Sequence, residues 1–128
     1  MWPVILPEAD ALLAPVTEIE GVKLACLIDA SSGMILASRQ ERDDGMSVPV
    51  AAAGATDIAH VLSLLTSELT ADGFEDVMVT FRDHFQVIRL VQPEAEPRIV
   101  LLVILDRSRA NLAMARLGIR NFCAGLAS

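Results

Sequence analysis

The chain has 128 residues, of which 53% are hydrophobic and 21% are charged, and its formal net charge is −7. This length suits one domain, residues 1–128, built on one hydrophobic core. An acidic domain repels phosphate backbones and anionic lipids, so the composition argues against nucleic-acid binding and against membrane attachment through a basic face.

Nothing in the sequence indicates export or membrane insertion. The longest uninterrupted apolar run covers residues 99–105, whereas a membrane-spanning helix needs about 20 apolar residues. The N-terminal sequence MWPVILPEAD lacks the basic region and the small-residue cleavage site of a signal peptide. Cys26 and Cys123 are too few and too far apart for a disulfide scaffold or a zinc cluster. We therefore expect a cytoplasmic protein with reduced thiols and no membrane insertion.

The first half of the chain predicts a short helix, a β-hairpin and a long helix. Pro7 followed by Glu8 and Asp10 is typical of a first helical turn, where acids face the positive end of the helix dipole. Partial alternation of apolar residues on both sides of an ASSG turn favours the hairpin. In chain order we expect a helix over 7–19, a strand over 22–29, a turn over 30–33, a strand over 34–38, a charged loop over 39–45, and a helix over 50–69 that ends before Asp72 and Gly73.

The long helix has two different faces. Large apolar residues at helical spacing form one stripe that we expect to bury against a sheet, namely Ile58, Val61, Leu62, Leu65 and Leu69, continued by the small residues Ala51, Gly54 and Ala55. A second, mixed face lies about 80–120° round the helix and consists of Ala53, Asp57, His60 and Leu64. Leu64 has no place in the main stripe, so an apolar residue is left over on the second face.

The second half predicts three strands and a last helix. We expect a strand over 77–81, a turn at 82–83, a strand over 84–91, an acidic loop over 93–97 and a strand over 98–105. Ser108 is expected to cap a helix that runs to about Gly125. The sheet-facing stripe of that helix is predicted to be Leu112, Ala115, Ile119, Phe122, Cys123 and Leu126.

The resulting order, α-β-β-α-β-β-β-α, predicts an α+β fold. Residues 99–105 are apolar on both faces, so this strand belongs at the centre of the sheet with helices above and below. Residues 34–38 and 75–81 carry more polar side chains and are expected at the sheet edges. We therefore expect a three-layer sandwich: a five-stranded antiparallel sheet with helix 50–69 on one face and the other two helices on the opposite face.

Side chains for catalysis or metal binding are scarce. No Cys, Asp or Glu stands near His60 or His84 at metal-ligand spacing, and we expect both histidines to be solvated or in an interface. Cys26 and Cys123 lie among apolar residues, where a thiol is inert. The junction from Asp106 through Arg107 and Ser108 to Arg109 lacks the glycines of a phosphate-binding loop. We therefore expect no catalytic residues, no metal site and no cofactor.

The chain resembles the Roadblock/LC7 family, which includes dynein light chains and MglB-like proteins with a profilin-like fold. The segment EIEGVKLACLIDASSGMILAS is similar to the family's first hairpin, and the Ala-rich helix from Val50 is similar to its second helix. FQVIRLV and RIVLLVILDRSRANLAMARLGIR are similar to its closing strands and last helix. The run from Asn111 to Arg116 is the most specific part of this resemblance, which covers about residues 12–126.

The resemblance implies a dimeric, non-enzymatic regulator or scaffold of a small Ras-like GTPase. Family members pair through the edge strand after the second helix, with the two copies of that helix side by side, as homodimers or heterodimers. The interface candidates are then Ala53, Asp57, His60 and Leu64 on the helix, and Asp76, Met78 and Thr80 on the edge strand. Two other readings stay open: a small-molecule sensor with a ligand between sheet and helix, and an enzyme that uses Asp106, Arg107 and Arg109.

Overall fold

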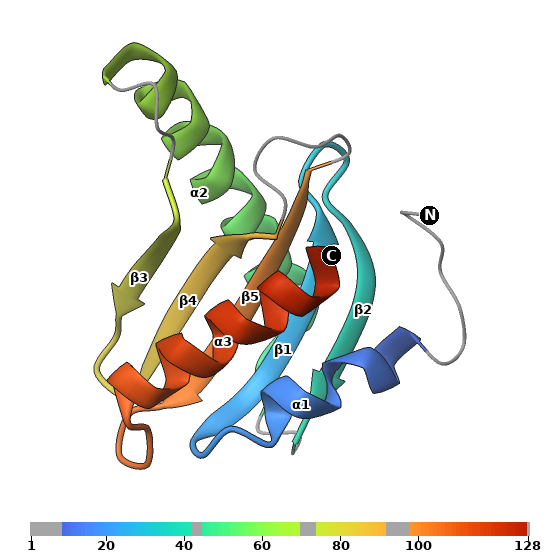
Figure 1. Cartoon of the computed structure of the whole chain (residues 1–128), viewed down its shortest axis with the longest axis vertical. Coiled ribbons are helices and arrows are strands. Elements are labelled where there is room, and N and C mark those ends of the chain that lie inside the picture. Colours follow the sequence, from blue (N-terminus) through green and yellow to red (C-terminus); the bar gives the residue numbers. More distant parts are fainter. Residues whose placement is uncertain (1–8, 42–44, 70–73, 92–97, 128) are drawn as a thin grey trace.

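The computed structural model describes residues 9–41, 45–69, 74–91 and 98–127, with the backbone alone at 67–69 and 127. Residues 7–8, 42–44, 72–73 and 93–97, to which the sequence assigned a helix start, part of a charged loop, a helix end and an acidic loop, lie outside the described residues. The elements are a 3-10 helix η1 (Ala9–Leu13), α1 (Ala14–Thr17), β1 (Val22–Asp29), β2 (Met34–Gln40), α2 (Val48–Leu69), β3 (Asp76–Thr80), β4 (His84–Leu90), β5 (Ile99–Asp106) and α3 (Leu112–Ala127) (Figure 1).

The five strands form one antiparallel sheet in the order β2-β1-β5-β4-β3. Strand β5 lies at the centre, where Leu102 is opposite Cys26 of β1 on one side and Ile88 of β4 on the other. Its seven residues from Ile99 to Leu105 are all buried. Strands β2 and β3 are the two edges. The predicted centre and the predicted edges of the sheet are confirmed.

Helices cover both faces of the sheet, as the predicted three-layer sandwich requires (Figure 1). Side chains of β5 alternate between the two faces: Leu101, Val103 and Leu105 pack with η1, α1 and α3, whereas Val100, Leu102 and Ile104 pack with α2. This alternation is the period-2 geometry of a strand, and burial on both faces gives β5 its continuous apolar sequence.

The first helix differs from the prediction of one helix over 7–19. The described part is a 3-10 helix, η1, followed by the single α-helical turn α1. Pro15 stands at the start of α1, where its missing N–H is tolerated but where it cannot continue a helix from the preceding turn. Gly21 then has a φ of +90°, a conformation that glycine adopts without strain and that turns the chain into β1.

Two more boundaries differ because of contacts that the sequence pattern does not reveal. Strand β2 extends through Arg39 to Gln40, because Gln40 is opposite Leu24 of β1 and the Arg39 Nε donates a hydrogen bond to the Thr17 hydroxyl at 3.2 Å. Strand β3 ends at Thr80 rather than 81, because the N–H of Phe81 bonds the carbonyl of His84 at 2.8 Å and starts the turn.

The predicted cap of the last helix is wrong. Helix α3 begins at Leu112, and the Asn111 Oδ1 accepts a hydrogen bond from the N–H of Met114 at 3.2 Å. Ser108 instead donates its hydroxyl and its backbone N–H to the Asp106 Oδ1, at 2.7 and 3.0 Å. This Asx turn closes the β5–α3 connection. Ser108 therefore stabilises the turn, and Asn111 caps the helix.

The predicted sheet-facing stripe of α2 is also largely wrong. The α2 residues buried against the sheet are mainly small: Ala52, Ala55, Thr56 and Ala59. Val61 is 57% exposed and Leu65 is 47% exposed, while Ile58 and Leu62 are half-buried; Leu69 lies outside the described side chains. A 22-residue helix is about 33 Å long, and the C-terminal half of α2 extends beyond the sheet (Figure 1).

The apolar surface of α2 has a further consequence. Its segment Val48–Thr66 is long and apolar enough to cross a membrane by length and composition, with a mean hydropathy of 1.5 and 22% of it buried. The comparison of uninterrupted apolar runs passes over this segment, because isolated polar residues such as Asp57 and His60 interrupt it. In the fold this segment lies on the sheet through its alanines, while Val61, Leu64 and Leu65 are exposed.

Candidate functional site

Helix α2 presents two adjacent flanks, centred about 100° apart round the helix, one toward β2 and one toward β3. The β2-side flank consists of Ala53, Asp57, His60 and Leu64, all exposed. The β3-side flank consists of Gly54, Ile58, Val61 and Leu65. Successive side chains are about 100° apart on a helix, so Ile58 and Leu65 point roughly away from Ala53 and His60. Two sets of contacts fix this orientation.

The β2-side flank is fixed by contacts with the turn between β1 and β2. The His60 ring nitrogen Nε2 lies 2.9 Å from the carbonyl oxygen of Ala30. A carbonyl only accepts, so Nε2 carries the proton and donates. Below this bond, Ser63 accepts a 2.7 Å hydrogen bond from Arg98, and a small hollow of about 230 Å³ separates the helix from the turn. His60 therefore contacts the turn while its side chain stays exposed, which agrees with the expectation that it is solvated or in an interface.

The same flank borders a larger hollow of about 440 Å³. Ala53, Thr56 and Asp57 line it from the helix, and Ile35 of β2 lines it from the sheet. At its rim Gly33 has a φ of +79°, and a side chain added there would meet nothing within 4 Å. The β2-side flank is thus a concave, mixed polar and apolar surface.

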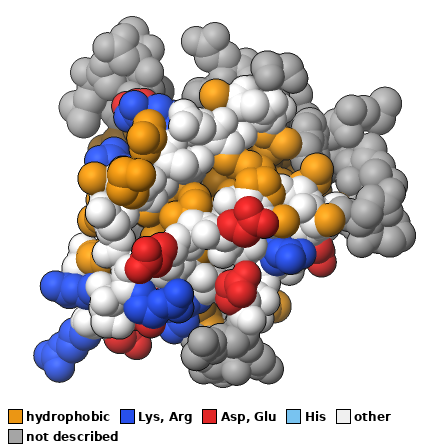
Figure 2. All heavy atoms as spheres, turned by 60° about the horizontal axis from the view of Figure 1, so that its bottom comes forward, with side chains coloured by type: hydrophobic (Ala, Val, Ile, Leu, Met, Phe, Trp, Pro, Cys, Tyr) orange, Lys and Arg blue, Asp and Glu red, His pale blue; other side chains and the backbone are white. Residues whose placement is uncertain are grey.

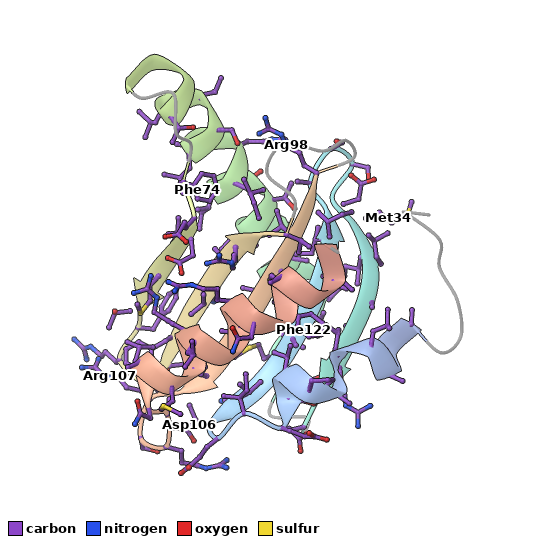
Figure 3. The ribbon with its side chains drawn as sticks, viewed as in Figure 1. Met34, Phe74, Arg98, Asp106, Arg107 and Phe122 are labelled. Atoms are coloured by element: carbon purple, nitrogen blue, oxygen red, sulfur yellow. The ribbon has the colours of Figure 1, made fainter. Side chains whose placement is uncertain are left out.

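The β3-side flank is apolar and leads to the open edge of the sheet. Ile58 packs in the same apolar cluster as Phe74 and Val77, and Phe74 lies between β3 and α2 (Figure 3). Val61 and Leu65 continue this surface outward and are exposed. Among the residues that the structure describes, strand β3 pairs with β4 alone. An exposed strand edge beside an apolar helix flank is a surface suited to another protein chain.

The three candidate residues on β3 point to the α3 side of the sheet. Met78 packs against the cluster beneath α3, and Thr80 is exposed. Asp76 accepts a bidentate pair of hydrogen bonds from Arg116 of α3, with distances of 3.0 to 3.3 Å, and lies 3.6 Å from Arg89 of β4. Its carboxylate is therefore occupied within the chain, and it holds the edge strand to α3.

The second histidine, His84, is the first residue of β4 and follows directly after the turn from β3. His84 stacks on Phe81 with 4.3 Å between ring centroids, and its Nδ1 lies 2.7 Å from Asp83. That hydrogen bond is the largest cause of the lowered pKa of the Asp83 carboxyl. The His84 side chain is only 14% exposed, so of the two expected surroundings, solvent or an interface, the solvated one is wrong for this ring, and the histidine closes the hairpin.

The junction after β5 forms the edge of a third hollow, of about 520 Å³. Asp106 and Arg109 line it together with Glu18, Glu20 and Lys23. Acidic and basic side chains alternate around apolar atoms on this face of the molecule (Figure 2). Hydrogen bonds from Ser108 lower the pKa of Asp106, which keeps it ionised as a turn acceptor. Arg107 bonds the Phe81 carbonyl at 3.0 Å, so this junction orders two turns (Figure 3).

The cysteines are buried and protonated. Desolvation by burial raises the pKa of Cys26 to about 12 and that of Cys123 to about 11. Among the described residues no group of three or more His, Cys, Asp and Glu side chains could hold a metal ion. The sheet faces beneath the helices are filled by side chains in two apolar clusters, and the hollows described above lie at their margins.

The sequence pattern places Ala53, Asp57, His60 and Leu64 on one face of α2. It does not reveal the β3-side flank, because Val61 and Leu65 have the spacing of core residues. The small residues Ala52, Ala55 and Ala59 were the available signal. Where alanines repeat at helical spacing, a helix can approach a sheet closely, and the larger residues beside them are left outside.

Comparisons with known proteins bear on the fold. No family model matches the sequence, and no curated protein does. Solved structures match over nearly the whole chain. An MglB with tetrameric arrangement has a TM-score of 0.81 at 17% identity, covering 98% of this chain and 93% of its own. The gliding protein MglB of Thermus thermophilus has a TM-score of 0.80 at 17% identity with the same coverage.

A Roadblock/LC7 domain from Streptomyces avermitilis has a TM-score of 0.77 at 13% identity, covering 97% of this chain and 96% of its own. At these identities the likeness concerns the arrangement of helices and strands. The element order and the sheet agree with the expectation drawn from the sequence. The chain has the Roadblock/LC7 fold.

Proposed function

We propose that this protein is a dimeric, non-enzymatic regulator or scaffold of a small Ras-like GTPase in the cytoplasm. The observation that carries the proposal is the outer surface of α2, where Val61, Leu64 and Leu65 are 57%, 71% and 47% exposed. Large apolar side chains so exposed on one helix mark a contact surface. A protein partner is favoured over a membrane because α2 already lies on the sheet and the chain has a net charge of −7.

Self-association is assigned to the β3-side flank and the β3 edge. Pairing of two β3 strands would extend the sheet across two copies and satisfy the open edge. The flanking Val61 and Leu65 would then be covered by the same residues of the second copy, with Gly54 allowing close approach. One solved structure with this fold is an MglB with tetrameric arrangement, which supports an oligomeric state here.

The GTPase is assigned to the β2-side flank. In a pair that forms through the β3 edges, Ala53, Asp57 and Leu64 of each copy lie about 80–120° round the helix from Leu65, on the side of α2 that we propose stays accessible. The resemblance to the Roadblock/LC7 family supports this partner class. The interface residues expected from sequence thus divide between two surfaces, one for a second copy and one for the GTPase.

Sedimentation of the purified chain tests the first half. We expect a dimer at micromolar concentration and a monomer for Leu65→Glu, because a buried glutamate would face the second copy. Leu117→Glu is the matched control, since Leu117 is 48% exposed on α3 and lies on neither flank. A monomeric wild type, or equal behaviour of the two variants, would refute this interface.

Binding assays test the second half. Each small Ras-like GTPase encoded in the same genome is loaded with GDP or with a non-hydrolysable GTP analogue, and its affinity for the chain is measured by calorimetry. We expect at least one to bind, and Leu64→Glu to abolish binding while the dimer persists. Absence of binding by every GTPase in both states would refute the regulatory function.

A further inference from the structure

We infer that Asp57 and the hollow beside it bind a lysine or arginine side chain of the protein that docks on the β2-side flank. This inference rests on the proposed function and specifies the chemistry of the partner: a basic side chain presented among apolar ones. It makes Asp57 the residue that selects that partner.

The first observation is the distribution of charge along the sequence. Between Arg42 and Arg82 there is no lysine or arginine, so α2, β3 and the segment that joins them carry acids as their only Asp, Glu, Lys or Arg residues: Asp57, Glu68, Asp72, Glu75 and Asp76. The acids of the β3 region have partners within the fold, since Arg89 lies 3.5 Å from Glu75 and Arg116 binds Asp76. Within the described part of the chain, no hydrogen bond or ion pair engages Asp57.

The second observation is the shape and chemistry of the hollow. Ile35, Pro49 and Ala53 supply an apolar wall, and no lysine or arginine is among the described residues that line it. The hydroxyl of Thr56 donates its proton to the Ala52 carbonyl at 2.9 Å, which leaves its oxygen as an acceptor. The Ser32 hydroxyl oxygen already accepts from the N–H of Met34 at 3.2 Å. The hollow therefore offers an apolar wall and hydrogen-bond acceptors.

This combination fits a long basic side chain. Lysine and arginine place their methylene stem on apolar surface and their charged end at a polar group. The charged end of the incoming side chain would make a charge-assisted hydrogen bond to Asp57 and supply the positive charge that the hollow lacks. The volume of about 440 Å³ accommodates one such side chain.

A second copy of this chain does not fit the site through α2, because α2 contains no lysine or arginine. Pairing of two α2 helices across Asp57 would place two carboxylates near each other, which is unfavourable. Asp57 therefore disfavours self-association on this flank and favours a different protein. The β3-side flank contains no charged residue and does not carry this penalty.

The test measures the affinity of the wild-type dimer for its GTPase at low and high salt, beside Asp57→Asn, Asp57→Lys and the control Glu41→Gln. Glu41 is an exposed acid outside both flanks. We expect Asp57→Asn to weaken binding by about tenfold or more and to remove most of its salt dependence, with Asp57→Lys weaker still. An arginine-to-glutamate change on the GTPase that restores binding to Asp57→Lys would identify the basic side chain.

Equal affinities for Asp57→Asn and Glu41→Gln would overturn the inference while leaving the proposed function intact. If the wild type binds no GTPase, both fall together. Sedimentation of each variant provides the second readout: we expect Asp57→Asn to remain a dimer, and its conversion to a monomer would also overturn the assignment of Asp57 to the partner surface.

Discussion

Arg116 of α3 holds Asp76 of the edge strand β3 by a bidentate pair of hydrogen bonds, at 3.0 to 3.3 Å. The two residues are far apart in sequence, and they connect the last helix to the open edge of the sheet. Arg89 of β4 approaches the same carboxylate at 3.6 Å. An edge strand with one strand neighbour is the part of a sheet most easily opened, so this contact supports the edge on which the proposed dimer depends.

Arg116→Ala is therefore expected to destabilise the fold by about 1 kcal/mol, the upper range for a partly exposed ion pair, because the geometry is bidentate. Amide hydrogen exchange in β3 should accelerate more than in β5. Arg120→Ala on the same helix is the control, since Arg120 is exposed and its loss should change stability by less than about 0.5 kcal/mol. Equal effects of the two substitutions would show that the Asp76 contact adds no stability.

Gly21 and Gly45 both have a left-handed backbone, but only Gly21 lies close to another backbone segment. Alanine substitutions at the two sites therefore separate the cost of the close approach from the cost of the dihedral angle. Both have positive φ, +90° and +84°, but a Cβ at Gly21 would lie 2.8 Å from the Cα of Ala110, whereas one at Gly45 would meet nothing within 4 Å. Gly45→Ala should cost about 1 kcal/mol for the left-handed conformation. Gly21→Ala should cost about 1–3 kcal/mol more through overpacking. Urea denaturation of both variants gives the difference, and similar values would mean that the Ala110 backbone yields.

The central strand could be placed from sequence because its pattern has one explanation. Seven buried apolar residues in a row require cover on both faces, and the polar residues of the outer strands then assign the edges. The flanks of α2 could not be placed in this way. Val61 and Leu65 have the spacing of a buried stripe, and a stripe that faces a second protein has the same spacing as one that faces a sheet.

The helix caps illustrate a second limit. Ser108 and Asn111 are both good capping residues, three positions apart, and local sequence does not choose between them. The choice depends on Asp106, whose carboxylate takes the hydroxyl and N–H of Ser108 into a turn. Likewise, the partners of Asp76 come from β4 and α3, and only the assembled fold brings them together.

Leu102 tests the central position of β5. It is fully buried, between Cys26 and Ile88 on the neighbouring strands, so Leu102→Ala should cost about 2–5 kcal/mol through lost burial and the cavity left behind. Met114→Ala on the exposed face of α3 removes a side chain that is 61% exposed and should cost less than about 1 kcal/mol. An unchanged denaturation midpoint for Leu102→Ala would contradict the packing of the sheet.

Asn111 and Ser108 test the corrected cap. Asn111→Ala should lower stability by about 1 kcal/mol, because the N–H of Met114 loses its acceptor. Ser108→Ala removes an exposed hydroxyl, but Asp106 still accepts a hydrogen bond from the backbone N–H of residue 108. We therefore expect stability to fall by less than about 0.5 kcal/mol. Thermal unfolding of the two variants in parallel distinguishes the two assignments. A larger effect at Ser108 would restore it as the cap.

The buried thiols predict a loss of stability at alkaline pH. Burial raises the pKa of Cys26 to about 12 and that of Cys123 to about 11, from a value of 9.0 for an unhindered thiol. Above pH 9 the unfolded chain releases these two protons while the folded chain keeps them, so the unfolded state is favoured and stability falls as pH rises through that range. Below pH 9 both states are protonated at these groups, and they contribute no slope.

Cys26→Ala and Cys123→Ala together should therefore flatten the dependence of the unfolding free energy on pH between about 9 and 11, beyond any constant loss from the cavities. In the wild type at pH 8, an aromatic disulfide reagent should label neither thiol in native buffer and both in urea, because the reactive thiolate forms only on exposure. Rapid labelling of either thiol in native buffer would contradict its burial. An unchanged alkaline slope in the double variant would assign that slope to groups other than the cysteines.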